Sequence, residues 1–342
     1  MAEQSSAGSD DPPFMEKYKN LFQRHGLTNQ TRHEAAEELE LPLIDLAELN
    51  SRDSAVRKEC QRRIARASRE WGFFQVVNHG IPPEVLENMR SEQVGLFSKA
   101  FVERERNMKV HFPDGNYQWG TPTATNLWQF SWSESFHVPL TDISNSSSAA
   151  AQTNLRSTMG KFAARSRELA QKLAAILVEE LGDKRGNYFQ EKCPISTCYV
   201  RMNRYPPCPN HVFGLTPHTD SDFLTILHQD QIGGLHLVKD NRWISVKPKP
   251  TALVINIGDL FQAWSNGVYK SVEHRVVANQ RKERFSTAFF FCPSYNTTIQ
   301  SSSHQPSVYK PFTFGEFRRQ VQEDVKNTGS KVGLPRFLAS ST

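Results

Sequence analysis

In the first half of the chain, segments whose apolar residues have helical spacing alternate with segments whose apolar residues have the spacing of strands. Positions three or four residues apart predict a helix over 54–71 that ends at Gly72. Short apolar runs on either side of it predict strands over 43–46 and 73–77. A further helix is expected to begin at Pro82-Pro83, because proline suits the first helical turn. The apolar positions of the first helix are Val56, Cys60, Ile64, Ala67 and Trp71.

The longest helix is expected over 155–181, with Gly182 as its stop. A Ser-, Ala- and Asn-rich segment, 144–154, precedes it and predicts a flexible loop. A last helix is expected over 314–325. The long helix carries one apolar stripe and is expected to brace a barrel. The stripe consists of Met159, Phe162, Ser166, Leu169, Leu173, Ile176, Leu177 and Leu181.

From about Cys193 to Tyr295 the chain consists of short β-branched or aromatic runs broken by Gly, Pro and Asn. This pattern predicts a β-sandwich or jelly roll. The predicted fold class is therefore mainly β with flanking helices. Four regions are expected: a partly ordered segment 1–40, an α/β region 41–192, the jelly-roll core 193–295 and a helical tail 296–342.

Composition places the chain among ordinary soluble proteins, with 38% hydrophobic and 23% charged residues in 342 and a formal net charge of +5. The densest basic run, 57–69, lies on the predicted helix 54–71. Its charges are therefore interpreted as the solvated side of an amphipathic helix. No nucleic-acid partner is expected.

The five cysteines form no Cys-x-x-Cys pair, and their odd number argues against a secreted disulfide framework. Residues 1–14 are polar and resemble no secretory or transit peptide. No apolar run reaches the roughly 18 residues that a membrane span requires. These features predict a cytoplasmic protein, with the nucleus as a further location, and no membrane association or obligate protein partner.

Candidate chemistry is concentrated in the predicted β-rich core. His218, Asp220 and His274 offer two imidazoles and a carboxylate, a set that can hold Fe(II) on one face and leave the other positions open. Arg284 offers a planar fork of donors to a carboxylate, and the hydroxyl of Ser286 points the same way along a strand. Together these five residues indicate iron with 2-oxoglutarate. Zinc is the alternative for the triad, but it would leave Arg284 and Ser286 without a role.

Several motifs around these residues resemble the plant 2-oxoglutarate- and Fe(II)-dependent dioxygenases from Leu41 to Phe337, and most of all the gibberellin 2-oxidases. Two further stretches, 117–122 and 131–139, are similar to the subgroup that acts on C20 gibberellins. The family motifs are LPLID (41–45), WGFFQVVNHG (71–80), NRYPPC (203–208), HTD (218–220), NIGD (256–259), SNG (265–267), YKSVEHR (269–275) and RFS (284–286).

The resemblance implies a double-stranded β-helix whose open mouth holds the metal. It implies Fe(II), 2-oxoglutarate and O2 as cofactor and co-substrates, with ascorbate as reductant. Tyr205 joins Arg284 and Ser286 in the co-substrate site by resemblance, and Asn203 shares a strand face with Tyr205. The implied activity is hydroxylation of gibberellins at C-2, which inactivates the hormone or its precursors.

The substrate residues are predicted from pattern and pocket chemistry. Arg201 lies on the strand face of Asn203 and Tyr205 and is the candidate cation for a gibberellin carboxylate. The alternative is that Arg201 pairs with an acid at the rim and that the aromatics predicted as apolar walls are ordinary core. Those aromatics are Tyr117, Trp119, Trp128 and Phe136. Three other histidines are interpreted as structural: His79, His228 and His236.

Two other functions remain open. One is a plant dioxygenase that acts on a different small apolar metabolite. The other, from a different class, is a non-catalytic barrel that binds a small molecule. Such a binder could lose an iron ligand without harm, whereas this chain keeps the triad and the Arg284/Ser286 pair together.

Overall fold

Two sheets form the centre of the protein, and helices cover the larger one. The structure is a computed structural model, and it describes residues 11–24, 36–144, 153–183, 187–208, 212–301 and 306–339. The eight-stranded sheet has the order β2 (Leu43–Asp45), β3 (Phe73–Val77), β11 (Leu253–Ile257), β8 (Leu224–Gln229), β13 (Arg284–Phe291), β6 (Tyr199–Tyr205), β5 (Glu134–Pro139) and β4 (Asn116–Trp119).

A smaller sheet and a short two-stranded ribbon, β14 (Thr298–Ile299) with β15 (Phe312–Thr313), complete the β structure. Apolar side chains from the eight-stranded and the smaller sheet belong to one cluster, which contains Phe73 and Val254 of the first and Leu235 and Leu237 of the second. The two sheets therefore pack face to face, as expected for a jelly roll. The smaller sheet has the order β1 (Glu37–Leu39), β10 (Arg242–Val246), β9 (Leu235–Lys239), β12 (His274–Val277) and β7 (Phe213–His218).

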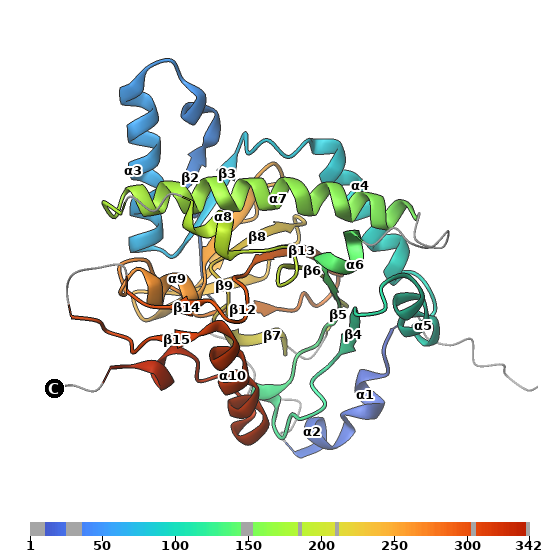
Figure 1. Ribbon diagram of the computed structural model, residues 1–342. Coiled ribbons are helices and arrows are strands. Elements are labelled where there is room, and N and C mark those ends of the chain that lie inside the picture. Colours follow the sequence, from blue (N-terminus) through green and yellow to red (C-terminus); the bar gives the residue numbers. More distant parts are fainter. Residues whose placement is uncertain are drawn as a thin grey trace, which may run out of the picture.

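Helices lie on opposite sides of the β core (Figure 1). The long helix α7 (Asn154–Glu179) crosses the eight-stranded sheet and contacts β8 and β13, and α4 (Pro83–Phe97) also contacts β13. On the far side, α10 (Phe314–Thr328) lies below β7 and β12 in Figure 1. The other helices are α1 (Phe14–Lys17), α2 (Lys19–Arg24), α3 (Ser54–Glu70), α5 (Phe101–His111), α6 (Leu140–Ser144), α8 (Tyr188–Lys192) and α9 (Asp259–Trp264), with 3-10 turns at Leu46–Asn50, Leu127–Gln129 and Leu334–Phe337.

Local chemistry explains why the helices begin and end where they do. Asp53 caps α3 by accepting a hydrogen bond from the Ala55 N–H, and Gly72 follows the helix at φ 64°. A Cβ on Gly72 would lie 2.3 Å from the Lys270 carbonyl oxygen, so this turn requires glycine. Thr313 and Glu316 form a capping box at the start of α10.

Most predicted elements agree with the observed ones. The helix over 54–71, the strands over 43–46 and 73–77 and the long helix agree within one or two residues, and the last helix extends to Thr328. Of the predicted loop 144–154, residues 145–152 lie outside the described residues. Strands from the 41–192 region continue the sheet of the core, so one sheet joins both regions.

All five cysteines are buried and free. The described part of the chain contains no helix with the length and apolarity that a membrane crossing requires.

Candidate metal and co-substrate site

Three side chains converge between the two sheets. His218 ends β7 and His274 begins β12, and the two residues are direct partners in the register of these strands. The Nε2 atom of each histidine lies 3.7 Å from Oδ1 of Asp220, and the possible ligand atoms all lie within 4.8 Å of one another. The three predicted ligands are therefore in position to bind a single metal ion.

Hydrogen bonds behind these ligands fix their direction. The Nδ1 atoms of His218 and His274 lie 2.8 and 3.0 Å from the carbonyl oxygens of Thr216 and Val272. An Nδ1–H that donates to a carbonyl leaves Nε2 as the metal-binding atom. Both histidines therefore present Nε2 to the site.

Two polar side chains orient Asp220 in the same way. Its Oδ2 accepts hydrogen bonds from Thr225 Oγ1 at 2.6 Å and Asn256 Nδ2 at 2.8 Å, which leaves Oδ1 toward the imidazoles. Neither Thr225 nor Asn256 was predicted as a site residue. Asn256 belongs to the NIGD stretch and Thr225 lies five residues after Asp220, but only the paired strands show that both reach the carboxylate.

The electrostatics of the site favour the protonation states that bind metal. Burial lowers the pKa of His218, and the neighbouring His274 lowers it further. Burial opposes ionisation of Asp220, but the two histidines and the bonds from Thr225 and Asn256 bring its pKa below the ordinary value. A neutral imidazole and an ionised carboxylate are the forms in which these groups bind a cation.

Arg284 begins β13 of the eight-stranded sheet, on the face that carries Thr225, and has unused donors. Its side chain is 1% exposed, and its Nη2 donates to Gln229 Oε1 at 2.7 Å. Its Nη1 lies 3.4 Å from Ser286 Oγ, and its Nε has no hydrogen-bond partner. Among the described residues no carboxylate pairs with this buried cation, which is costly unless an anionic ligand completes the site.

The other predicted co-substrate residues surround Arg284. Tyr205 and Asn203 on β6 are the register partners of Arg284 and Ser286 on β13, and Asn203 Nδ2 lies 3.4 Å from Ser286 Oγ. Gln229 was not predicted, although alternation along β8 puts it on the face of Thr225. The carboxylate-binding chemistry at Arg284 favours iron with 2-oxoglutarate over the zinc alternative, which gives Arg284 no role.

Arg201 faces the same interior, two residues before Asn203. It is the register partner of Ala288 and His137, and its Nη2 donates to Ser135 Oγ at 3.0 Å. Its buried Nε has no partner, and within the described ranges no carboxylate pairs with it. Burial, then Arg201, then Arg318 of α10 lower the pKa of His137 to about 4. Arg201 and Arg318 therefore both place positive charge near His137.

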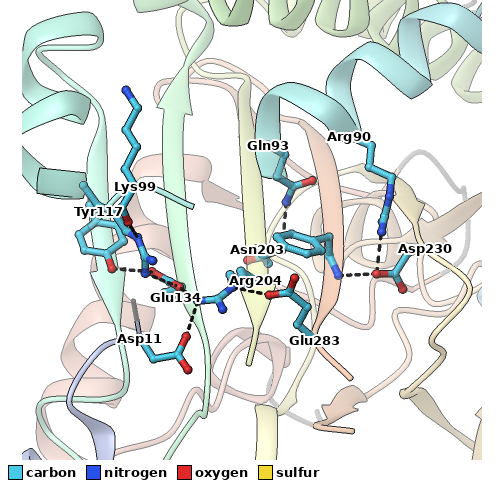
Figure 2. Close-up of polar contacts among 12 residues, drawn as sticks. Asp11, Arg90, Gln93, Lys99, Tyr117, Glu134, Asn203, Arg204, Asp230 and Glu283 are labelled. Atoms are coloured by element: carbon cyan, nitrogen blue, oxygen red, sulfur yellow. Dashed lines mark hydrogen bonds and ion pairs between the residues drawn. The ribbon is translucent and has the colours of Figure 1, made fainter. Parts of the chain in front are cut away.

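The four predicted wall aromatics require a correction, because the structure does not bring them together around Arg201. Phe136 is fully buried on the opposite face of β5 from Ser135 and His137, and its ring lies 4.8 Å from that of Tyr117. The Tyr117 hydroxyl donates to Glu134 Oε2 at 2.6 Å, on the side where Arg204 also pairs with Glu134 (Figure 2).

The two tryptophans lie elsewhere as well. Trp119 packs against Phe14 and Tyr18 of the N-terminal helices, with ring centroids 5.5 and 5.9 Å away. Trp128 is 60% exposed and its ring lies 5.6 Å from that of Phe213. A sequence motif can predict that an aromatic residue lies on a strand, but it does not show which face of the sheet the side chain occupies. The aromatic side chains beside Arg201 are Tyr199 and Phe290, whose rings stack at 4.4 Å.

The three histidines interpreted as structural do not join the metal ligands. His79 and His228 line a cavity of about 510 Å³ between α4 and the end of β8. His236 lies on β9 as the register partner of Arg275.

Comparison with known proteins agrees with this site. Residues 196–293 match the 2OG-Fe(II) oxygenase superfamily, and residues 41–158 match the family described as non-haem dioxygenase in morphine synthesis N-terminal. The chain is 56% identical to Gibberellin 2-beta-dioxygenase 8 of Arabidopsis thaliana over 341 residues, which covers 96% of this chain and 98% of that protein. It is 50% identical to Gibberellin 2-beta-dioxygenase 6 of Oryza sativa subsp. japonica, covering 89% and 87%.

Solved structures show the same architecture. The crystal structure of JOX2 in complex with 2OG, Fe and JA has a TM-score of 0.72 at 29% identity, covering 93% of this chain and 97% of that one. The dioxygenase for auxin oxidation of rice has a TM-score of 0.71 at 28% identity, covering 88% and 100%. The predicted double-stranded β-helix is thereby confirmed.

Proposed function

The chain belongs to the gibberellin 2-beta-dioxygenases of the 2OG-Fe(II) oxygenase superfamily, and from this premise we propose that it hydroxylates C20 gibberellins at C-2 and so inactivates the hormone or its precursors. The observations that carry the activity are the convergence of His218, Asp220 and His274 and the burial of Arg284, for which the described residues supply no carboxylate partner. A metal ligand set and a carboxylate receptor are the two parts that a 2-oxoglutarate-dependent reaction requires.

The donor set fits Fe(II), which His218 Nε2, Asp220 Oδ1 and His274 Nε2 would hold. When bound, iron with 2-oxoglutarate and O2 supplies the oxidation: the co-substrate becomes succinate and CO2, and the second oxygen atom enters the substrate C–H bond as hydroxyl. Ascorbate keeps the iron reduced. The protein's own contribution is position and electrostatics.

Arg284 and Ser286 hold the far carboxylate of 2-oxoglutarate in this proposal. Gln229 fixes the guanidinium through Nη2, so the remaining donors keep one direction. Tyr205 covers the guanidinium, with its ring centroid 4.9 Å from the guanidinium carbon, and excludes water from it. A fixed, dry receptor binds a carboxylate more strongly than a solvated one.

Arg201 holds a substrate carboxylate in this proposal. Burial, Arg201 and Arg318 lower the pKa of His137 to about 4, so this imidazole is neutral near pH 7 and Arg201 is the cation of this strand pair. Arg318 brings a second cation to the same region, and no carboxylate partner is found for it in the described part of the chain. An open C20 gibberellin carries two free carboxylates, whereas a C19 gibberellin has one of them closed in a lactone. Two cations therefore favour the C20 class.

The alternatives have less support. A dioxygenase for another small metabolite would share the metal site, but the relatives at 56% and 50% identity are both named for gibberellin. A non-catalytic binder has no need for both the metal ligands and Arg284. A cytoplasmic and nuclear location without a membrane, nucleic-acid or obligate protein partner completes the proposal, and the free cysteines support a reducing compartment. A fluorescent fusion retained in any other compartment would contradict that location.

The direct test is to incubate the purified protein with Fe(II), 2-oxoglutarate, ascorbate and a panel of C19 and C20 gibberellins. Mass spectrometry should show a gain of one oxygen on C20 substrates, with succinate formed in equal amount. A C19 preference would contradict the C20 assignment. Succinate without any hydroxylated gibberellin would contradict the substrate class.

A further inference from the structure

A lysine from the C-terminal tail reaches the loop that carries Asp220. The chain turns at Gly329, φ 74°, immediately after α10. Two residues later Lys331 Nζ lies 2.8 Å from the Thr219 carbonyl oxygen, 2.8 Å from Ser221 Oγ and 2.6 Å from Asp259 Oδ2. Thr219 and Ser221 are the two neighbours of Asp220, so one ammonium group contacts the metal loop on both sides of the ligand.

This contact is buried and complete. The side chains of Lys331 and Asp259 are 11% and 3% exposed. An ammonium group has three N–H donors, and three acceptors surround this one. Lys331 Nζ also lies 5.5 Å from the centroid of the Phe317 ring, which keeps the side chain on α10. A desolvated ion pair with every donor used holds its partners in one geometry.

Asp259 extends the contact to the ligand itself. Its Oδ2 accepts from Thr219 Oγ1 at 3.1 Å, and its backbone N–H donates to the Asp220 carbonyl oxygen at 2.9 Å. Lys331 therefore closes a set of contacts around the backbone of Asp220. This set is separate from the bonds of Thr225 and Asn256 to the carboxylate, so backbone and side chain of the ligand are fixed independently.

We propose that Lys331 is a positioning residue for the metal site: it clamps residues 219–221 so that Oδ1 of Asp220 points to the imidazoles, and it thereby makes metal affinity depend on docking of the C-terminal tail. The inference rests on the metal-binding part of the proposed function and needs no particular substrate. Tail docking alone would stabilise the protein without changing how the loop binds a cation.

The test compares two variants that loosen the same tail. Lys331→Met keeps the length of the side chain and removes the charge and all three donors. Arg336→Ala is the matched control, because Arg336 pairs with Asp324 of α10 at 3.0 Å and is 48% exposed, away from the loop. The readouts are the affinity for Co(II), titrated by its visible absorption in the absence of gibberellin, and hydrogen exchange of residues 218–222 in the metal-free protein.

Lys331→Met should bind Co(II) about tenfold more weakly and exchange these amides faster, whereas Arg336→Ala should match the wild type in both. Lys331→Arg, which keeps charge and donors, should recover part of the affinity. Wild-type Co(II) affinity in Lys331→Met, or an equal loss in Arg336→Ala, would overturn the proposal.

Should Lys331→Met fail to fold, Ser221→Ala decides the question. That variant removes one acceptor of the ammonium group and leaves the ion pair with Asp259 intact. It should weaken Co(II) severalfold in a folded protein, and an unchanged affinity would reject the clamp. Since Co(II) binding needs no gibberellin, a wrong substrate assignment would leave these results unchanged, and a failed clamp would leave gibberellin hydroxylation by the wild type unchanged.

Discussion

The guanidinium carbon of Arg284 lies 4.9 Å from the centroid of the Tyr205 ring on the neighbouring strand. The two residues are direct register partners of β13 and β6. Since the ring covers the cation and Gln229 holds Nη2, Arg284 can turn neither to solvent nor to another acid. Its orientation is therefore fixed before any co-substrate arrives.

Replacing Arg284 should affect the co-substrate and little else. Losing charge-assisted hydrogen bonds to a carboxylate costs about 1.5–3 kcal/mol. Arg284→Met should therefore raise the 2-oxoglutarate concentration for half-maximal turnover by roughly tenfold or more, with a smaller change for gibberellin. Steady-state kinetics with each component varied in turn would measure both. A shift in the gibberellin requirement alone would make Arg284 a substrate residue.

Removal of any one metal ligand should abolish metal binding without unfolding the protein. We expect His218→Ala, Asp220→Ala and His274→Ala each to lose turnover and Fe(II) binding, because the three ligands share one ion. The far-ultraviolet circular dichroism of each variant should remain that of the wild type. Turnover retained in any of the three would contradict the ligand assignment.

A buried charge cluster on the other face of the sheet should contribute to stability, not catalysis. Glu134 Oε1 accepts from Arg104 and Arg204 at 2.8 and 2.7 Å, and the side chains of Glu134 and Arg104 are 0% exposed. Removing one partner of a buried ion pair costs about 3–5 kcal/mol. Glu134→Ala should lower the free energy of unfolding in denaturant by about that amount.

The exposed acid Glu59 provides the control for this cluster. It pairs with Arg62 and Arg66 on α3 and is 50% exposed, so Glu59→Ala should change stability by less than about 1 kcal/mol. Equal effects of the two substitutions would show that burial of Glu134 adds nothing.

The site could be predicted from sequence where spacing along one strand decides which side chains share a face. Arg284 with Ser286, and Asn203 with Tyr205, lie two residues apart, so alternation alone puts each pair on one side. The prediction of the aromatic walls was wrong because no local pattern shows which face of β5 carries the side chains that lie on the side of Arg201. Phe136 and His137 are neighbours in sequence, yet only His137 lies on the face of Arg201.

Long-range contacts could not be predicted for a different reason. Lys331 lies more than 100 residues from the loop that it contacts, and no periodicity connects the two. Thr225 and Gln229 alternate correctly along β8, but their partners Asp220 and Arg284 depend on how strands pair. Strand pairing is a tertiary property, and local patterns in a single sequence do not show which strands pair.

Burial of neutral histidines should make the protein less stable in acid. Burial and the two arginines lower the pKa of His137 to about 4, below the ordinary value of about 6.5. Between these values the unfolded chain binds more protons than the folded one, so stability is present above pH 6.5 and is lost as pH falls toward 4. From pH 7 to pH 5 this histidine accounts for a loss of about 2 kcal/mol.

A substitution isolates the contribution of His137 to this loss of stability in acid. His137→Gln should reduce the difference in unfolding free energy between pH 7 and pH 5 by about 2 kcal/mol, measured with denaturant on the metal-free protein. The remaining slope should include His228, whose pKa burial also lowers to about 4. An unchanged slope in His137→Gln would mean that the imidazole has the same pKa in the folded and unfolded states.

The last prediction concerns the two cations at the substrate end. Arg201 faces the interior from β6 with a buried, unpaired Nε, and Arg318 acts on the same His137 from α10. If each arginine binds one carboxylate, Arg201→Ala and Arg318→Ala should each lower kcat/KM for a dicarboxylate C20 gibberellin about tenfold or more. The exposed neighbour Arg319 is the control, and Arg319→Ala should behave as the wild type.

Substrate esters separate carboxylate recognition from general damage to the pocket. A methyl ester should be a poor substrate for the wild type and no worse for Arg201→Ala, because the group that Arg201 would bind is already neutral. Substrate-independent conversion of 2-oxoglutarate to succinate should persist in both variants, because Arg284 and the metal ligands are unchanged. Wild-type protein that turned over acid and ester equally would show that no cation binds the carboxylate, and Arg201 and Arg318 would then have no role in substrate recognition.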